Sequence, residues 1–167
     1  MDATDRFALP FILPGQAQKE LFHNEALQML DALVAAAVEE PPRSSPPASP
    51  LAGDCYIVGA QPTGDWANHA GHLAAYSSAG WRYLAPIEGL RAYVRSTGTV
   101  ATYRGGSWEI GLVRASSVLV SGQQVVGERR SGISNPSGGS VIDSEARAAI
   151  GAMLAALRAH GLIDPQN

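Results

Sequence analysis

The sequence has one cysteine, Cys55, and no apolar run that approaches the roughly 18 uninterrupted residues of a membrane-spanning helix. A lone thiol excludes an intrachain disulfide and a cysteine-rich zinc site. The Lys and Arg residues number 12 against 15 Asp and Glu, which leaves a net charge of −3. Because the arginines are scattered and form no basic stripe, we expect neither direct nucleic-acid binding nor membrane insertion.

We also expect no secretory signal in the first residues. Asp2 and Asp5 stand where a signal has basic residues, and Pro10 and Pro14 interrupt the apolar run. We therefore expect the protein to be made in the cytoplasm.

The sequence does contain an apolar N-terminal arm, residues 1–15. It holds five large apolar side chains: Phe7, Leu9, Phe11, Ile12 and Leu13. Such a proline-punctuated segment makes a poor central strand, and in water it would promote aggregation. The arm could fold back on its own domain or lie across a neighbouring subunit. We expect assembly contacts at these five residues and at Phe22.

The spacing of apolar residues predicts an amphipathic helix from Gln16 to about Glu39. The residues that recur at helical spacing are Phe22, Ala26, Met29, Leu33 and Ala37. With the arm, this helix makes up an assembly segment, residues 1–40. Residues 41–50, PPRSSPPASP, then predict an extended Pro/Ser linker, because prolines stop the helix and cannot continue in a central strand.

Over residues 51–126, apolar and polar residues alternate with a period of two, as in β-strands. Segments rich in Tyr, Trp, Val and Ile alternate with turn signals such as SSAG, STGT and RGGS, and the predicted strands are 54–59, 71–76, 81–85, 90–96, 100–104, 108–112 and 117–126. A Tyr stands five residues before a Trp in both 75–81 and 102–108, which predicts two similar hairpins. Even spacing of this kind is typical of an antiparallel meander or a small barrel-like domain.

A Gly/Ser-rich connector, residues 127–142, precedes an alanine-rich helix over residues 143–163. Asp143 or Ser144 can cap its N-terminus, while Arg158 and His160 suit the negative end of its dipole. Small alanines allow close approach, so we expect this helix to pack against another helix, in the same chain or another. The predicted fold class is therefore α+β.

No enzyme motif is present: GxSxG, a P-loop, HExxH and GxGxxG are all missing. We expect no enzymatic activity and no cofactor. The nearest approach to a metal site is His69 and His72 with Asp65. Because Gly71 places these histidines in a loop and no further ligand is fixed by spacing, solvated loop histidines are the favoured interpretation. A metal-dependent hydrolase is the alternative.

Aromatic residues in the predicted hairpins suggest glycan binding, since sugars stack apolar CH faces on flat rings. The candidates are Trp66, Tyr76, Trp81, Tyr103 and Trp108. The same residues could instead fill the core of a small β-domain. Trp66, in the polar loop GDWANH, is expected to be the most exposed.

The motifs LPGQAQKE and GDCYIVGAQPTGDW, followed by an alanine-rich C-terminal helix, resemble a domain family of unknown function. Members of that family occur in tail-fibre and head-spike proteins of prophages and of gene transfer agents, which are phage-like particles that move DNA between bacteria. The resemblance spans nearly the whole chain and brings no catalytic residues. It implies a role on a particle surface, where a spike helps attachment to the polysaccharide capsule of the recipient cell.

We therefore expect a head-spike or fibre protein, assembled on the surface of a phage-like particle released from the cell. The expected partners are further copies, as a trimer or pentamer, a capsid vertex or companion spike protein, and a cell-surface polysaccharide. The alternatives are a stand-alone carbohydrate-binding module and a tail-fibre adaptor.

Overall fold

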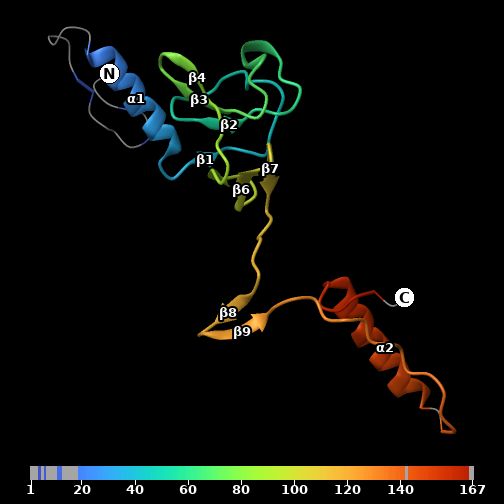
Figure 1. Ribbon diagram of the computed structural model, residues 1–167. Coiled ribbons are helices and arrows are strands. Elements are labelled where there is room, and N and C mark those ends of the chain that lie inside the picture. Colours follow the sequence, from blue (N-terminus) through green and yellow to red (C-terminus); the bar gives the residue numbers. More distant parts are fainter. Residues whose placement is uncertain (1–3, 5, 7–10, 13–18, 142, 166–167) are drawn as a thin grey trace. The chain divides into compact units, whose positions relative to one another are not determined.

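The computed structural model describes residues 4, 6, 11–12, 19–141 and 143–165. The chain forms two compact units, Met1–Leu112 and Val113–Asn167 (Figure 1).

Within the described residues, the first unit contains one α-helix, one short 3-10 helix and seven strands. In chain order they are α1 (Lys19–Leu33), β1 (Ala37–Val38), β2 (Cys55–Ile57), η1 (Gly64–Trp66), β3 (Leu73–Ser77), β4 (Gly80–Leu84), β5 (Arg91–Val94), β6 (Thr99–Arg104) and β7 (Ser107–Ile110). The helix lies beside the strands (Figure 1).

The strands of this unit form two sheets, ordered β2-β3-β4 and β1-β5-β6-β7. Both contain an antiparallel meander, and in the described residues neither closes into a barrel. The predicted pair of similar hairpins is confirmed, since Tyr76 lies opposite Trp81 on β3-β4 and Tyr103 lies opposite Trp108 on β6-β7. One pairing departs from the prediction, because β1 runs parallel to β5. The α+β fold class is confirmed.

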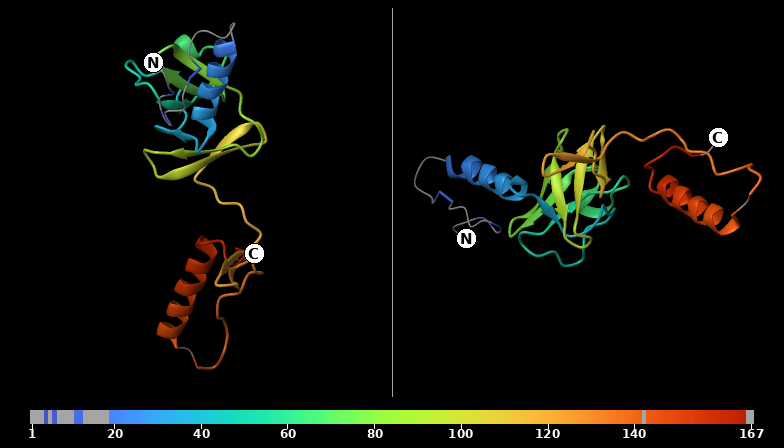
Figure 2. Two further views of the ribbon diagram at one scale, coloured as in Figure 1. Left: turned by 90° about the vertical axis from the view of Figure 1, so that its left-hand side faces the viewer. Right: turned by 90° about the horizontal axis from the view of Figure 1, so that it is seen from below.

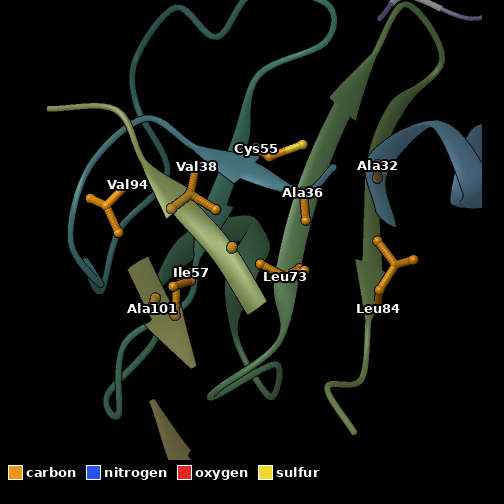
Figure 3. Close-up of a cluster of buried hydrophobic side chains, with 10 residues drawn as sticks. Ala32, Ala36, Val38, Cys55, Ile57, Leu73, Leu84, Val94 and Ala101 are labelled. Carbon is orange, nitrogen blue, oxygen red and sulfur yellow. The ribbon is translucent and has the colours of Figure 1, made fainter. Parts of the chain in front are cut away.

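The main core of the first unit joins α1 to both sheets (Figure 3). Its buried members are Ala32, Ala36, Val38, Cys55, Ile57, Leu73, Leu84, Ala92, Val94 and Ala101. Strand β5 shows the alternation that a half-buried strand requires, with Ala92 and Val94 buried and Arg91 and Tyr93 exposed. The side chains from β5 and β6 in this core are small, so the core is dominated by Ile57 and Leu73 from the other sheet.

The first helix ends earlier than predicted. It was expected to reach Glu39, but it stops at Leu33, and Ala35 adopts a left-handed backbone with φ of 46°. The next residues pair with β5 instead: Tyr93 N donates to Ala36 O at 2.8 Å and Arg95 N donates to Val38 O at 2.9 Å. Strand pairing and the full burial of Val38 outweigh the helical preference of this alanine-rich stretch.

The predicted Pro/Ser linker is packed within the first unit. Gly59 N donates to Arg43 O at 2.7 Å, and Thr63 N donates to Ser44 O at 2.8 Å. This close approach favours glycine at position 59, because a Cβ there would lie 3.1 Å from the Arg43 backbone and 2.9 Å from Ser44 Oγ, and both would have to shift. Residues 43–44 therefore form an edge of the β-domain.

The second unit contains β8 (Val118–Val120), β9 (Gln123–Val126) and α2 (Ser144–Ala159) (Figure 2). Residues 117–126 were predicted as one strand, and this was wrong. Ser121 and Gly122, with φ of 49° and 79°, turn the segment into a hairpin. The break between units therefore falls after Leu112, whereas the sequence placed the end of the β-domain at Val126.

Helix α2 begins as predicted. The Asp143 side chain caps it by accepting a hydrogen bond from Ala146 N at 2.8 Å. The connector binds the segment that follows its C-terminal end: Arg130 N donates to Leu162 O at 3.1 Å, and Asp164 N donates to Arg130 O at 2.8 Å. The expected packing of α2 against another helix stays a prediction. Neither helix of the described residues is long and apolar enough to cross a membrane.

Replacing Leu73 with alanine should lower the free energy of unfolding by about 2–5 kcal/mol, because Leu73 is 2% exposed and its loss leaves a cavity between the sheets. The matched control is Ile87→Ala at a 73% exposed position, which should change it by less than about 0.5 kcal/mol. Tryptophan fluorescence during urea unfolding reports on the first unit, which holds all three tryptophans. Equal effects of the two substitutions would contradict the assigned core.

Candidate functional site

The five predicted glycan-binding aromatics divide into two groups. Trp66, Tyr76 and Trp81 gather with Tyr56 on the face of the β2-β3-β4 sheet that turns away from the main core. Tyr103 and Trp108 lie instead on the β6-β7 hairpin, with ring centroids 5.4 Å apart. The five aromatic side chains therefore do not form one surface.

The expectation that Trp66 is the most exposed of these residues was wrong. Its side chain is 0% exposed, and its ring lies 5.2 Å from Trp81 and 5.7 Å from Tyr56. The polar loop around it folds over the sheet, so that the indole becomes the centre of a second small core. A side chain in this position cannot contact a ligand, and Trp66 is a packing residue.

Tyr76 and Trp81 are half-buried at the margin of this second core, 4.8 Å apart across β3 and β4. Their edge-on geometry and packing are those of a cross-strand aromatic pair. The structure thus assigns these two rings to the sheet and not to a shared surface with Tyr103 and Trp108.

The two loop histidines take part in aromatic packing. The His69 ring stacks on Tyr83, with centroids 3.6 Å apart and planes 7° apart, and lies edge-on to His72 at 5.4 Å. The Tyr83 hydroxyl donates to Asp65 O at 2.5 Å, and burial, with the nearby Asp65 carboxylate, raises the pKa of Tyr83. In the described part of the chain, no group of three or more His, Cys, Asp or Glu residues could hold a metal ion.

A groove of about 340 Å³ runs between the β6-β7 hairpin and the segments before and after the 60–70 loop. Its lining is Pro42, Ile57, Val58, Gly59, Ala60, Ala70, Gly71, Tyr103, Gly106, Ser107 and Trp108. Trp108 Nε1 donates to Gly71 O at 2.8 Å, which fixes the indole across the groove. The groove is the place where two of the predicted glycan-binding residues come together.

The chemistry of this groove is neutral and partly apolar. Among the described residues that line it, none carries a charge, and several are glycine or alanine beside the Tyr103 and Trp108 rings. Ser107 adds a hydroxyl that can donate and accept. An uncharged molecule with an apolar face and a polar rim fits such a surface. The glycine-bearing edges at 59–60 and 70–71 were missed from sequence, because only long-range folding brings them to the hairpin.

The described residues of the N-terminal arm contact α1 and the residues that directly follow it in the same chain. Thr4 Oγ1 donates to Asp31 Oδ1 at 2.8 Å, and the Arg6 guanidinium donates to carbonyls at the C-terminal end of α1, including Ala32 O at 3.1 Å and Ala35 O at 3.0 Å. Ile12 N donates to Asn24 Oδ1 at 2.9 Å. At these points the arm folds back on its own domain.

The six predicted assembly residues have different outcomes. Phe7, Leu9 and Leu13 lie outside the described residues. Phe11 and Ile12 are half-buried, while Phe22 on α1 is 78% exposed. Their part in assembly stays a prediction.

Two buried groups, one in each core of the first unit, have raised pKa values. Burial, the larger cause, and nearby acidic groups raise the pKa of the Cys55 thiol to about 11, although Arg6 acts in the opposite direction. Burial also raises the pKa of Tyr56 to about 12, with the Asp54 carboxylate adding to the effect. A 3% exposed thiol that stays protonated is a packing group and a poor nucleophile.

The free energy of unfolding should fall as the pH rises from 9 toward 11, because the unfolded chain loses the Cys55 proton near pH 9 while the folded chain keeps it. Cys55→Ala should reduce this slope in urea titrations at successive pH values, even if it lowers stability at every pH. An unchanged slope would show that Cys55 titrates alike in both states.

One family model agrees with this chain. A family described as "Protein of unknown function (DUF2793)" matches residues 23–109, which is more than half of the chain and runs from within α1 to within β7. The match includes both sheets, Tyr103 and Trp108. No curated protein matches this sequence.

Proposed function

We propose that this chain, which belongs to the DUF2793 family of proteins of unknown function, is a structural component of a phage-like particle. In this proposal it is a head-spike or fibre protein of a gene transfer agent and helps the particle attach to the polysaccharide of the recipient cell. Support comes from the motifs LPGQAQKE and GDCYIVGAQPTGDW, which resemble spike and fibre proteins of such particles.

The observation that carries the attachment role is the groove at the β6-β7 hairpin. The rings of Tyr103 and Trp108 have centroids 5.4 Å apart and planes 64° apart. Ser107, which directly precedes Trp108, adds a hydroxyl to the same groove. A polysaccharide presents repeated rings with the same combination of apolar faces and hydroxyl rims. The lining favours a neutral sugar over an acidic one, because its described residues include no cation that would pair with a carboxylate.

The same groove supports a second candidate, a stand-alone carbohydrate-binding module. In both cases the protein binds sugar through Tyr103 and Trp108, but only the first requires it to be part of a particle. Incorporation into purified particles therefore distinguishes the two functions.

The test uses the full chain and Tyr103→Ala, with Tyr93→Ala as the matched control. Tyr93 is 49% exposed and lies on the opposite face of the same sheet, so its loss removes a similar surface ring away from the groove. Tyr103→Ala should weaken binding to purified recipient capsular polysaccharide by roughly 2- to 10-fold in calorimetric titration, as expected for one aromatic contact. Tyr93→Ala should bind as the unsubstituted protein does.

Particles made with each variant provide the second measurement. The protein should be found in particles of normal yield, and those carrying Tyr103→Ala should adsorb less to recipient cells. A chain that is absent from purified particles but binds the polysaccharide would favour the module. Equal binding by both variants would remove the groove from the proposal, and no binding by the unsubstituted protein would remove the attachment role.

A further inference from the structure

Helix α1 is inverted relative to the usual surface helix of a globular domain. Its polar residues face the rest of the first unit: Asp31 is 3% exposed, and Glu25 Oε1 accepts from Arg82 Nε on β4 at 2.9 Å. Its large apolar residues face outward instead, with Phe22 78% exposed and Met29 41% exposed. Within the described residues of the first unit, α1 is therefore held by polar contacts and by the buried Ala32, and its large apolar side chains on the other face stay exposed.

The exposed apolar residues form one seam, defined as Phe22, Ala26, Met29 and Leu33. Their spacing is four, three and four residues, which is the a/d spacing by which one helix packs along another. Leu30, 48% exposed, widens the seam on one side. None of these five residues carries a charge, so two identical seams can meet without repulsion.

We propose that the seam is covered by the α1 seam of a second copy of this chain, with the two helices antiparallel about a two-fold axis. This inference does not rest on the proposed function. The choice of a helix as partner follows from the a/d spacing, and the choice of a second copy follows from a seam that is uncharged and complementary to itself.

The sizes of the seam residues determine the orientation. In a parallel pair, identical residues meet, so that the small Ala26 faces Ala26 and leaves a gap between two layers of large side chains. In an antiparallel pair, Phe22 faces Leu33 and Ala26 faces Met29, which fills the interface evenly. Antiparallel dipoles also favour this arrangement.

The contact is short, because α1 has 15 residues and the seam covers about three turns. An interface of this size belongs to the weak, reversible class. It joins chains in pairs, which differs from the trimer or pentamer expected from the sequence.

Sedimentation equilibrium of the full chain tests the pairing. The unsubstituted protein should show a monomer–dimer equilibrium, and Met29→Glu should raise the dissociation constant at least about 10-fold, because it places a charge from each copy at the centre of the interface. Ile87→Glu is the matched control, since it puts the same charge on an exposed apolar residue away from α1 and should leave the equilibrium unchanged. A strictly monomeric protein, or an equal effect of both substitutions, overturns the proposal.

Disulfide formation tests the orientation. Phe22→Cys and Leu33→Cys should each fail to form a disulfide-linked dimer alone, because identical positions lie about 16 Å apart along an antiparallel pair. An equimolar mixture of the two should form one. Native Cys55 is buried and does not interfere. If each variant forms a disulfide-linked dimer with itself, or if the mixture forms none, the antiparallel contact is overturned. Unchanged circular dichroism spectra confirm that both variants are folded.

Discussion

The segment from Ala36 to Arg43 is the constraint on which the first unit depends, because its backbone bonds to both sheets in succession. Its first half pairs with β5, where Tyr93 N and Arg95 N donate to its carbonyls. Its second half pairs with β2, where Glu39 N donates to Cys55 O at 3.0 Å. Val38, between the two halves, is fully buried at the centre of the main core. One short segment thus holds the two meanders face to face.

This connection also determines what α1 can do. Because the chain leaves Leu33 and enters β1 within a few residues, the helix is held against the first unit at its C-terminal end. The Arg6 guanidinium binds carbonyls there, and the Glu25–Arg82 ion pair fixes the helix to β4. These polar contacts orient α1 with its apolar seam outward. The same geometry that completes the core therefore creates the proposed contact between copies.

The two aromatic groups show how similar hairpins acquire different roles. On β3-β4, the loop that carries Trp66 places its indole against Trp81, and Trp81 packs in turn on Tyr76, so both rings are packing residues. On β6-β7, the corresponding Trp108 packs partly against the main core and donates a hydrogen bond to Gly71 O at the edge of that loop. One hairpin is covered and the other borders a groove. The candidate binding site exists because the loop covers one hairpin and stops beside the other.

The sequence by itself determined the α+β class, the β3-β4 and β6-β7 hairpins and the start of α2, since these follow from local periodicity, turn residues and capping chemistry. Only the tertiary structure decided which aromatic rings are buried, where α1 ends and which face of α1 is exposed. Trp66 lies in a polar loop that looks exposed, and Ala37 continues a helical pattern that the chain abandons for β1. In both cases contacts between residues far apart in the chain outweigh local preference, and no local pattern contains them.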